Sequence, residues 1–146
     1  MDSLYQFTLR HQGNLERNLA RSPCLLGVQI LLVDDSVENI LLFNRVLKKE
    51  GANTDGAENG LVAIEKQKHQ KYDVIIMDVR MPIMDGYEAT RTIRLNGYLG
   101  PIIALTAHAV PGEKERCMAA GCSAFYSKPI DRQNLLRAIL FSLGKF

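Results

Sequence analysis

The stretch from Tyr72 to Gly86 constrains the fold of this chain more than any other part of the sequence. Its residues 74–77 are four apolar side chains in a row, a pattern that predicts a strand buried on both faces. The strand ends on Asp78, and a loop containing Pro82 follows. Open α/β sheets place their chemistry at the carboxyl ends of parallel strands. Asp78 is therefore a candidate functional residue, although an acid at a strand end can also simply open a turn.

From residue 28 onward, strand-like and helix-like segments alternate five times. The strands are expected at 28–33, 52–57, the run ending at 78, 101–106 and 123–127, and the helices at 36–51, 60–69, 85–95, from Val110 or Pro111 to Ala120, and after the cap Asp131. The second strand is short and weak, which favours a place near the sheet edge. Five such units predict an α/β fold, a doubly wound parallel sheet of the flavodoxin-like (βα)5 type with strand order 2-1-3-4-5.

Composition excludes several functional classes. The 146 residues suit one domain, with 47% hydrophobic and 23% charged residues and a net charge of +2. Basic residues are scattered, so no nucleic-acid partner is expected. No apolar run approaches the ~20 residues of a membrane span, so no membrane contact is expected from this segment. We expect a cytoplasmic protein, monomeric or weakly dimeric.

Four of the five predicted strands end in a polar residue suited to one shared site. Asp34 and Asp35 follow the first strand, Asp78 ends the third, Thr106 ends the fourth and Lys128 follows the fifth. Three neighbouring carboxylates repel unless a cation lies among them, and Mg²⁺ is the hard cation that such acids bind. A carboxylate, a divalent metal and an ammonium together favour phosphoryl transfer. The nucleotide-binding pattern Gly-x-x-x-x-Gly-Lys-Ser/Thr is absent from the sequence, so ATP is not expected as the direct donor.

Residues 28–143 resemble the response-regulator receiver domain of two-component signalling (CheY-like), a family that itself has this strand order. Residues 77–86, Met-Asp-Val-Arg-Met-Pro-Ile-Met-Asp-Gly, are similar to the family's phosphoacceptor signature. Asp34-Asp35 matches its acidic pair, 104–107 its switch threonine and 127–129 its Ser-Lys-Pro segment.

The resemblance implies that Asp78 accepts a phosphoryl group from a phosphohistidine. The partner would be a histidine kinase or a histidine phosphotransfer domain. The resemblance also implies that Asp35, Asp78 and the backbone carbonyl of Arg80 bind Mg²⁺ directly, with Asp34 often acting through water. The Lys128–Pro129 peptide bond would be cis, which X-Pro bonds tolerate.

The resemblance further implies a switch. In the family, the hydroxyl of the residue matching Thr106 moves toward the phosphoryl group, and an aromatic residue on the fifth strand turns inward. The matching position here is Phe125, where the family more often has tyrosine. The change would reshape the face made by the helix ending at Ala120, the fifth strand and the last helix. Arg80 and His108 match positions that tune the lifetime of the phosphoryl group in the family, although either could simply face solvent.

Three alternatives stay open. A flavin-binding electron carrier shares the expected fold, but Asp34-Asp35 would repel a flavin phosphate. A pseudo-receiver would interact with partners without being phosphorylated, although such proteins usually lack an acid or the lysine. The domain is either a stand-alone regulator or part of a hybrid sensor histidine kinase, whose parent chain could carry a membrane anchor. We favour the hybrid, because Ser3–Leu9 resembles the closing strand of a kinase ATP-binding domain; residues 1–27 would then be a linker or remnant of that domain.

Overall fold

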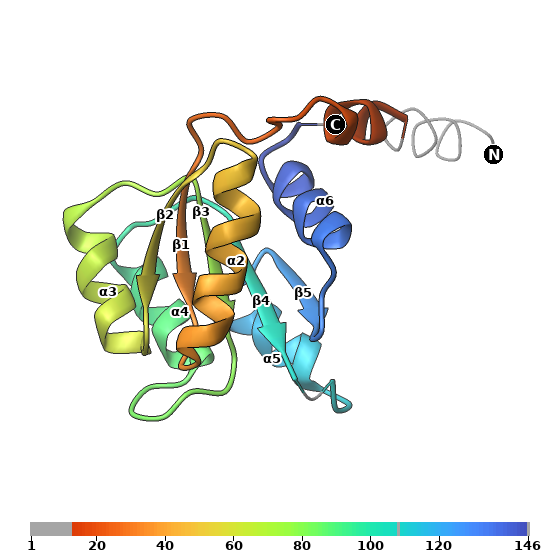
Figure 1. The fold of residues 1–146 in the computed structure, drawn as a ribbon. Helices are drawn as coiled ribbons and strands as arrows, with labels where there is room; N and C mark the ends of the chain where they lie inside the picture. Colours follow the sequence, from red (N-terminus) through yellow and green to blue (C-terminus); the bar gives the residue numbers. More distant parts are fainter. Residues whose placement is uncertain (1–12, 108, 146) are drawn as a thin grey trace.

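The computed structural model describes residues 13–107 and 109–145, which form an α/β fold around one parallel sheet (Figure 1). The strand order is β2-β1-β3-β4-β5, as the sequence predicted. The strands are β1 (Gln29–Val33), β2 (Asn53–Ala57), β3 (Val74–Asp78), β4 (Ile102–Thr106) and β5 (Ala124–Ser127). The weak second strand lies at an edge, and β3 lies at the centre with all five residues buried.

Helices cover both faces of the sheet. They are α2 (Val37–Lys49), α3 (Gly60–His69), α4 (Gly86–Leu95), α5 (Glu113–Ala120) and α6 (Arg132–Ser142). One hydrophobic cluster contains buried side chains of α3, α4 and α5, and the other contains those of α2 and α6. Figure 1 shows α2 in front of the sheet and α6 beside it. Within the described ranges, no helix is long and apolar enough to cross a membrane.

The side chains of β1 explain why this strand shows no polar alternation. Leu31 and Val33 belong to one hydrophobic cluster, whereas Ile30 and Leu32 belong to the other. Successive residues of a strand point to opposite faces, and here both faces are covered by helices. A continuous apolar run is therefore the expected pattern for this strand.

Helix α5 starts later than the sequence predicted. We expected it from Val110 or Pro111, but it begins at Glu113. Gly112 has a φ of 87°, a left-handed conformation that a residue inside an α-helix does not adopt and that glycine tolerates best. The delayed start makes Glu113 the first helical residue, and its side chain is buried.

Residues 13–27, which precede β1, take part in the packed fold. Residues 13–20 are helical, which the sequence analysis did not predict, and Leu15 and Leu19 pack against the cluster under α2 and α6. Leu25 is fully buried, and its N–H donates to the carbonyl of Glu50 at 2.8 Å. The predicted kinase remnant Ser3–Leu9 lies outside the described residues.

Candidate phosphoryl-transfer site

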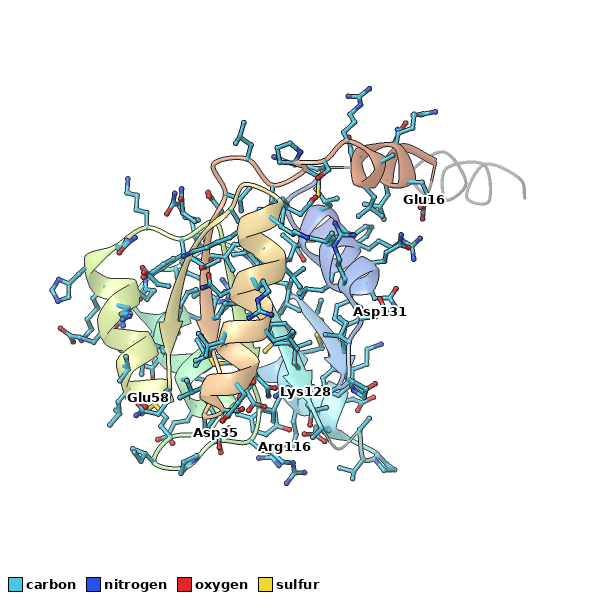
Figure 2. All side chains as sticks on the ribbon, in the orientation of Figure 1. Glu16, Asp35, Glu58, Arg116, Lys128 and Asp131 are labelled. Atoms are coloured by element: carbon cyan, nitrogen blue, oxygen red, sulfur yellow. The ribbon has the colours of Figure 1, made fainter. Side chains whose placement is uncertain are left out.

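The predicted site residues meet at the carboxyl end of the sheet. Asp78 is the last residue of β3, and Thr106 is the last residue of β4. Figure 2 shows Asp35 and Lys128 at the end of the sheet toward which the strand arrows point. Adjacent β1 and β3 are in register, with Val33 opposite Met77, so the residues that follow them lie close together. Parallel pairing thus gathers side chains that are far apart in the sequence.

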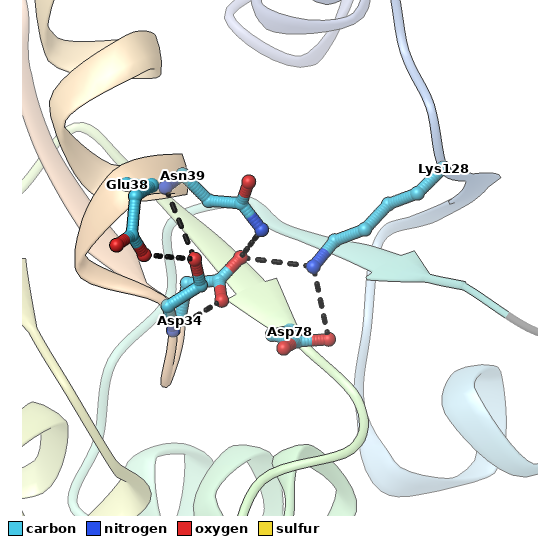
Figure 3. A network of polar contacts seen from close by, with 6 residues as sticks. Asp34, Glu38, Asn39, Asp78 and Lys128 are labelled. Atoms are coloured by element: carbon cyan, nitrogen blue, oxygen red, sulfur yellow. Dashed lines mark hydrogen bonds and ion pairs between the residues drawn. The ribbon is translucent and has the colours of Figure 1, made fainter.

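Asp34 is the most heavily bonded carboxylate of the site (Figure 3). Its Oδ1 accepts a hydrogen bond from the backbone N–H of Ser36 at 2.9 Å. Its Oδ2 accepts from the Asn39 side chain at 3.2 Å and from the Lys128 ammonium at 2.8 Å. These contacts hold Asp34 in one orientation although only 4% of its surface is exposed. Asn39 was missed by the sequence analysis; its only signal was a polar side chain in the first turn of α2.

Three carboxylates lie close enough to hold one metal ion. Oxygen atoms of Asp34, Asp35 and Asp78 are all within 4.8 Å of one another. Asp34 and Asp78 are buried, whereas Asp35 is exposed. An all-oxygen donor set, open to solvent on one side, fits Mg²⁺, which keeps several waters and few protein ligands.

Asp78 sits in an environment that disfavours its negative charge. Burial, partly offset by the Lys128 charge and reinforced by the Asp34 charge, raises the pKa of Asp78 from 3.8 to about 6. Hydrogen bonds from Lys128 and from the Arg80 backbone act in the opposite direction. Lys128 therefore compensates only part of the unfavourable effect of burial on the Asp78 charge. This is expected for a site that binds a further cation.

Lys128 connects the two buried acids (Figure 3). Its Nζ lies 2.8 Å from Oδ2 of Asp34 and 3.4 Å from Oδ1 of Asp78. Burial alone would lower the pKa of Lys128, but the hydrogen bond to Asp34 and the charges of both acids outweigh it and raise the pKa above 10.5. The ammonium is thus fixed beside Asp78. The Lys128–Pro129 peptide bond is cis.

Thr106 is fully buried and makes a contact that the sequence analysis missed. Its Oγ1 donates to Oε1 of Glu113 at 3.0 Å. Its backbone carbonyl accepts from the Lys128 N–H at 2.7 Å, which ties the end of β4 to the residue after β5. An acid directly after Gly112 could have indicated Glu113 as a helix-start residue, but nothing in the sequence indicated its contact with Thr106.

The remaining predicted residues lie around this centre. The Arg80 side chain is 57% exposed, and its Nη2 lies 3.8 Å from Oε2 of Glu113. Phe125 is half-buried, pairs with Ala104 across the sheet and packs against the cluster under α3, α4 and α5. The predicted lifetime-tuning residue His108 lies outside the described residues.

An open groove of about 280 Å³ lies next to the ammonium. Its lining comes from α2 and from the segment after β5 and includes Asn39, Leu42, Phe43, Lys128 and Ile130. Nearby on α2, Val37, Leu41 and Leu42 are each more than half exposed. A partly apolar surface therefore borders the acidic centre.

Comparisons with known proteins agree with this geometry. Residues 30–140 match the family described as the response regulator receiver domain. The chain is 40% identical over 123 residues to hybrid signal transduction histidine kinase M of Dictyostelium discoideum, covering 77% of this chain and 5% of that protein. It is 38% identical over 112 residues to the two-component response regulator ORR41 of rice, covering 74% of this chain and 88% of that protein.

A solved structure gives the same result. The receiver domain of a sensor histidine kinase from Pseudomonas aeruginosa, with a magnesium ion coordinated in its active site cleft, superimposes with a TM-score of 0.75 and 40% identity. The match covers 81% of this chain and 98% of that one. The fold and the strand-end residues define a receiver of the CheY-like class. The chain belongs to the response regulator receiver family of two-component signalling.

Proposed function

We propose that this receiver accepts a phosphoryl group on Asp78 from a phosphohistidine of a partner protein. The observation that carries the proposal is the position of the Lys128 ammonium, 2.8 Å from Asp34 and 3.4 Å from Asp78. A buried carboxylate with a fixed ammonium beside it and two further acids close by suits a nucleophile for phosphoryl transfer. A pseudo-receiver, which is not phosphorylated, would not need these three acids and the lysine to lie close together.

The transfer exchanges one bond to phosphorus for another. A carboxylate oxygen of Asp78 forms a bond to phosphorus as the bond between phosphorus and the histidine nitrogen breaks. The electron pair of the broken bond stays on the imidazole, which takes up a proton from solvent. Lys128 neutralises an oxygen of the transferring group.

Asp34, Asp35, Asp78 and the backbone carbonyl of Arg80 would hold Mg²⁺, with Asp34 acting through water. The short distances among the three carboxylates and the raised pKa of Asp78, caused chiefly by burial, support a cation at this place. When bound, Mg²⁺ supplies positive charge to the phosphoryl oxygens that Lys128 does not reach.

The partner is a histidine kinase or a histidine phosphotransfer domain that docks on α2 beside the site. The exposed apolar side chains Val37, Leu41 and Leu42 and the adjoining groove support this surface. A helix that carries the phosphohistidine could pack its apolar face there and direct the imidazole toward Asp78.

Phosphorylation would act as a switch through Thr106 and Phe125. A phosphoryl oxygen on Asp78 would attract the Thr106 hydroxyl, and Phe125 would turn further into the core. Phe125 belongs to β5, between α5 and α6, so its movement would reshape the surface of these three elements.

The domain is proposed to work as the receiver of a hybrid sensor histidine kinase. Its similarity to hybrid kinase M supports this context. The chain spans only 5% of that protein, and a stand-alone regulator of the ORR41 kind is the alternative. The coding sequence upstream of residue 1 discriminates between them, because a kinase core there would establish the hybrid.

Labelling by acetyl phosphate tests the acceptor role. We expect phosphorylation only with Mg²⁺ present, and we expect Asp78→Asn to abolish it. Asp85→Asn is the matched control, because it changes an acid in the same loop while Asn can still accept the capping hydrogen bond from Glu88. Full labelling of Asp78→Asn would refute the assignment.

A further inference from the structure

We propose that Glu113 is a positioning residue that holds the Thr106 hydroxyl in the unphosphorylated state and competes with the phosphoryl group for it. The inference rests on the proposed acceptance of phosphate by Asp78. Glu113 would oppose the movement of Thr106 in the switch. It lies on α5, whereas the other residues of the site lie at the strand ends.

The contact joins two fully enclosed groups. Thr106 has no exposed surface, Glu113 has 2%, and Oγ1 donates to Oε1 at 3.0 Å. A threonine hydroxyl carries a single proton, so it can donate to Glu113 or to a phosphoryl oxygen, but not fully to both. Movement of this hydroxyl toward Asp78 therefore removes a donor from Glu113.

Glu113 is held in place from several directions. Its Oε2 accepts weakly from the Val110 N–H at 3.4 Å and lies 3.8 Å from Nη2 of Arg80. Burial raises the pKa of Tyr87 to about 12, and the charge of Glu113 and a hydrogen bond between the two side chains add to this rise. The carboxylate thus contacts the loop after β3, helix α4 and the turn before α5, and it has little freedom to follow Thr106.

When the Thr106 hydroxyl moves away, the buried carboxylate of Glu113 loses a hydrogen-bond donor. Hydrogen bonds to an ionised acceptor are roughly twice as strong as neutral ones, and a buried carboxylate that loses a donor is poorly compensated. Glu113 therefore favours the resting position of Thr106. Arg80, two residues after Asp78, is the group placed to approach Glu113 when the hydroxyl leaves.

Glu113→Gln tests this role because it keeps the size and an acceptor oxygen but removes the charge. The probe is beryllofluoride with Mg²⁺, a mimic of the phosphoryl group, titrated into the full chain and followed by NMR. We expect the half-saturating concentration to fall by about 10-fold, because the resting state holds Thr106 less strongly. An unchanged or higher concentration would overturn the proposal.

Glu50→Gln is the matched control. Glu50 is also a buried acid, with 1% exposed surface, and it accepts from Ser22 at 2.7 Å and pairs with Arg132. This variant tests the loss of a buried charge away from Thr106, and we expect the same half-saturation as in the unmodified chain. A decrease as large as that of Glu113→Gln would overturn the specific role of Glu113.

A double-mutant cycle separates positioning from general stability. In a Thr106→Val background the hydroxyl is gone, so the added Glu113→Gln change should leave the half-saturation unmoved. A persistent 10-fold effect there would contradict a role through Thr106.

The unmodified chain gives an independent measurement if a variant fails to fold. The carboxyl carbon signal of Glu113 should shift when beryllofluoride binds, because the carboxylate loses its hydroxyl donor; an unmoved signal would overturn the inference. Failure of the unmodified chain to bind beryllofluoride would instead refute the acceptor role of Asp78, and the role of Glu113 with it.

Discussion

Replacing Asp78 by Asn should stabilise the metal-free protein at neutral pH. The pKa of Asp78 rises from 3.8 to about 6, chiefly because the carboxylate is buried. Each pH unit between the folded and unfolded pKa values corresponds to about 1.4 kcal/mol, so the charged form costs the folded state about 3 kcal/mol. Asn avoids this cost, and the contact of Lys128 with Asp34, 2.8 Å in the unmodified protein, does not involve Asp78. Since Asn accepts hydrogen bonds less well than a carboxylate, we expect a net gain of about 1 to 3 kcal/mol at pH 7.

The pH dependence has a definite sign. Between the two pKa values the folded protein binds a proton at Asp78 that the unfolded chain has released. The free energy of unfolding of the unmodified protein should therefore decrease as the pH rises from about 4 to about 6 through this group. The gain in stability of Asp78→Asn over the unmodified protein should be smallest below about pH 4 and should reach its full size above about pH 6.

Urea denaturation with EDTA, at several pH values, measures this difference. Asp35→Asn is the control and should change stability much less, because Asp35 is exposed. Added Mg²⁺ should reduce the difference in free energy of unfolding between the two proteins, since metal binding stabilises the unmodified protein more than the variant. An Asp78→Asn protein that is less stable at pH 7, or a difference that does not vary with pH, would refute the electrostatic account of the site.

The other predictions concern the ammonium, the loop and the switch. Lys128→Ala should destabilise the protein by about 3 kcal/mol without unfolding it, because two buried acids lose their cation. Phosphorylation of this variant should no longer alter the Phe125 NMR signals. Complete unfolding of the variant would contradict the prediction. Gly86→Ala should destabilise by more than about 2 kcal/mol in chemical denaturation, because a Cβ would lie 2.3 Å from the Asp78 carbonyl oxygen. Gly13→Ala is its control and should be mild, because no atom lies within 4 Å of an added Cβ at Gly13; equal effects of the two would argue against the clash. In the unmodified protein, Phe125 ring signals should shift with beryllofluoride, and unmoved signals would contradict the two-state switch.

The sequence predicted the sheet and most of the site because both depend on local patterns. Apolar runs gave the strands, and the residue after each run gave Asp34, Asp78 and Thr106. Once the strand order was assumed, parallel pairing placed these residues together. Lys128 followed in the same way from the fifth strand.

Other features depend on contacts between distant segments. The bond from Thr106 to Glu113 requires α5 to begin at Glu113, and that start depends on the left-handed backbone of Gly112. The helix at 13–20 is short and polar, and its two leucines gain burial only against a cluster formed by the rest of the fold. Local sequence patterns do not contain this tertiary information.

The most direct test identifies which acid carries the phosphoryl group. The protein is phosphorylated by a histidine phosphotransfer partner or by acetyl phosphate with Mg²⁺. The acyl phosphate is then reduced with borohydride and mapped by peptide mass spectrometry. The account predicts reduction to homoserine at position 78 alone, with Asp34 and Asp35 unmodified. Modification at either of those two acids, with position 78 unmodified, would contradict it.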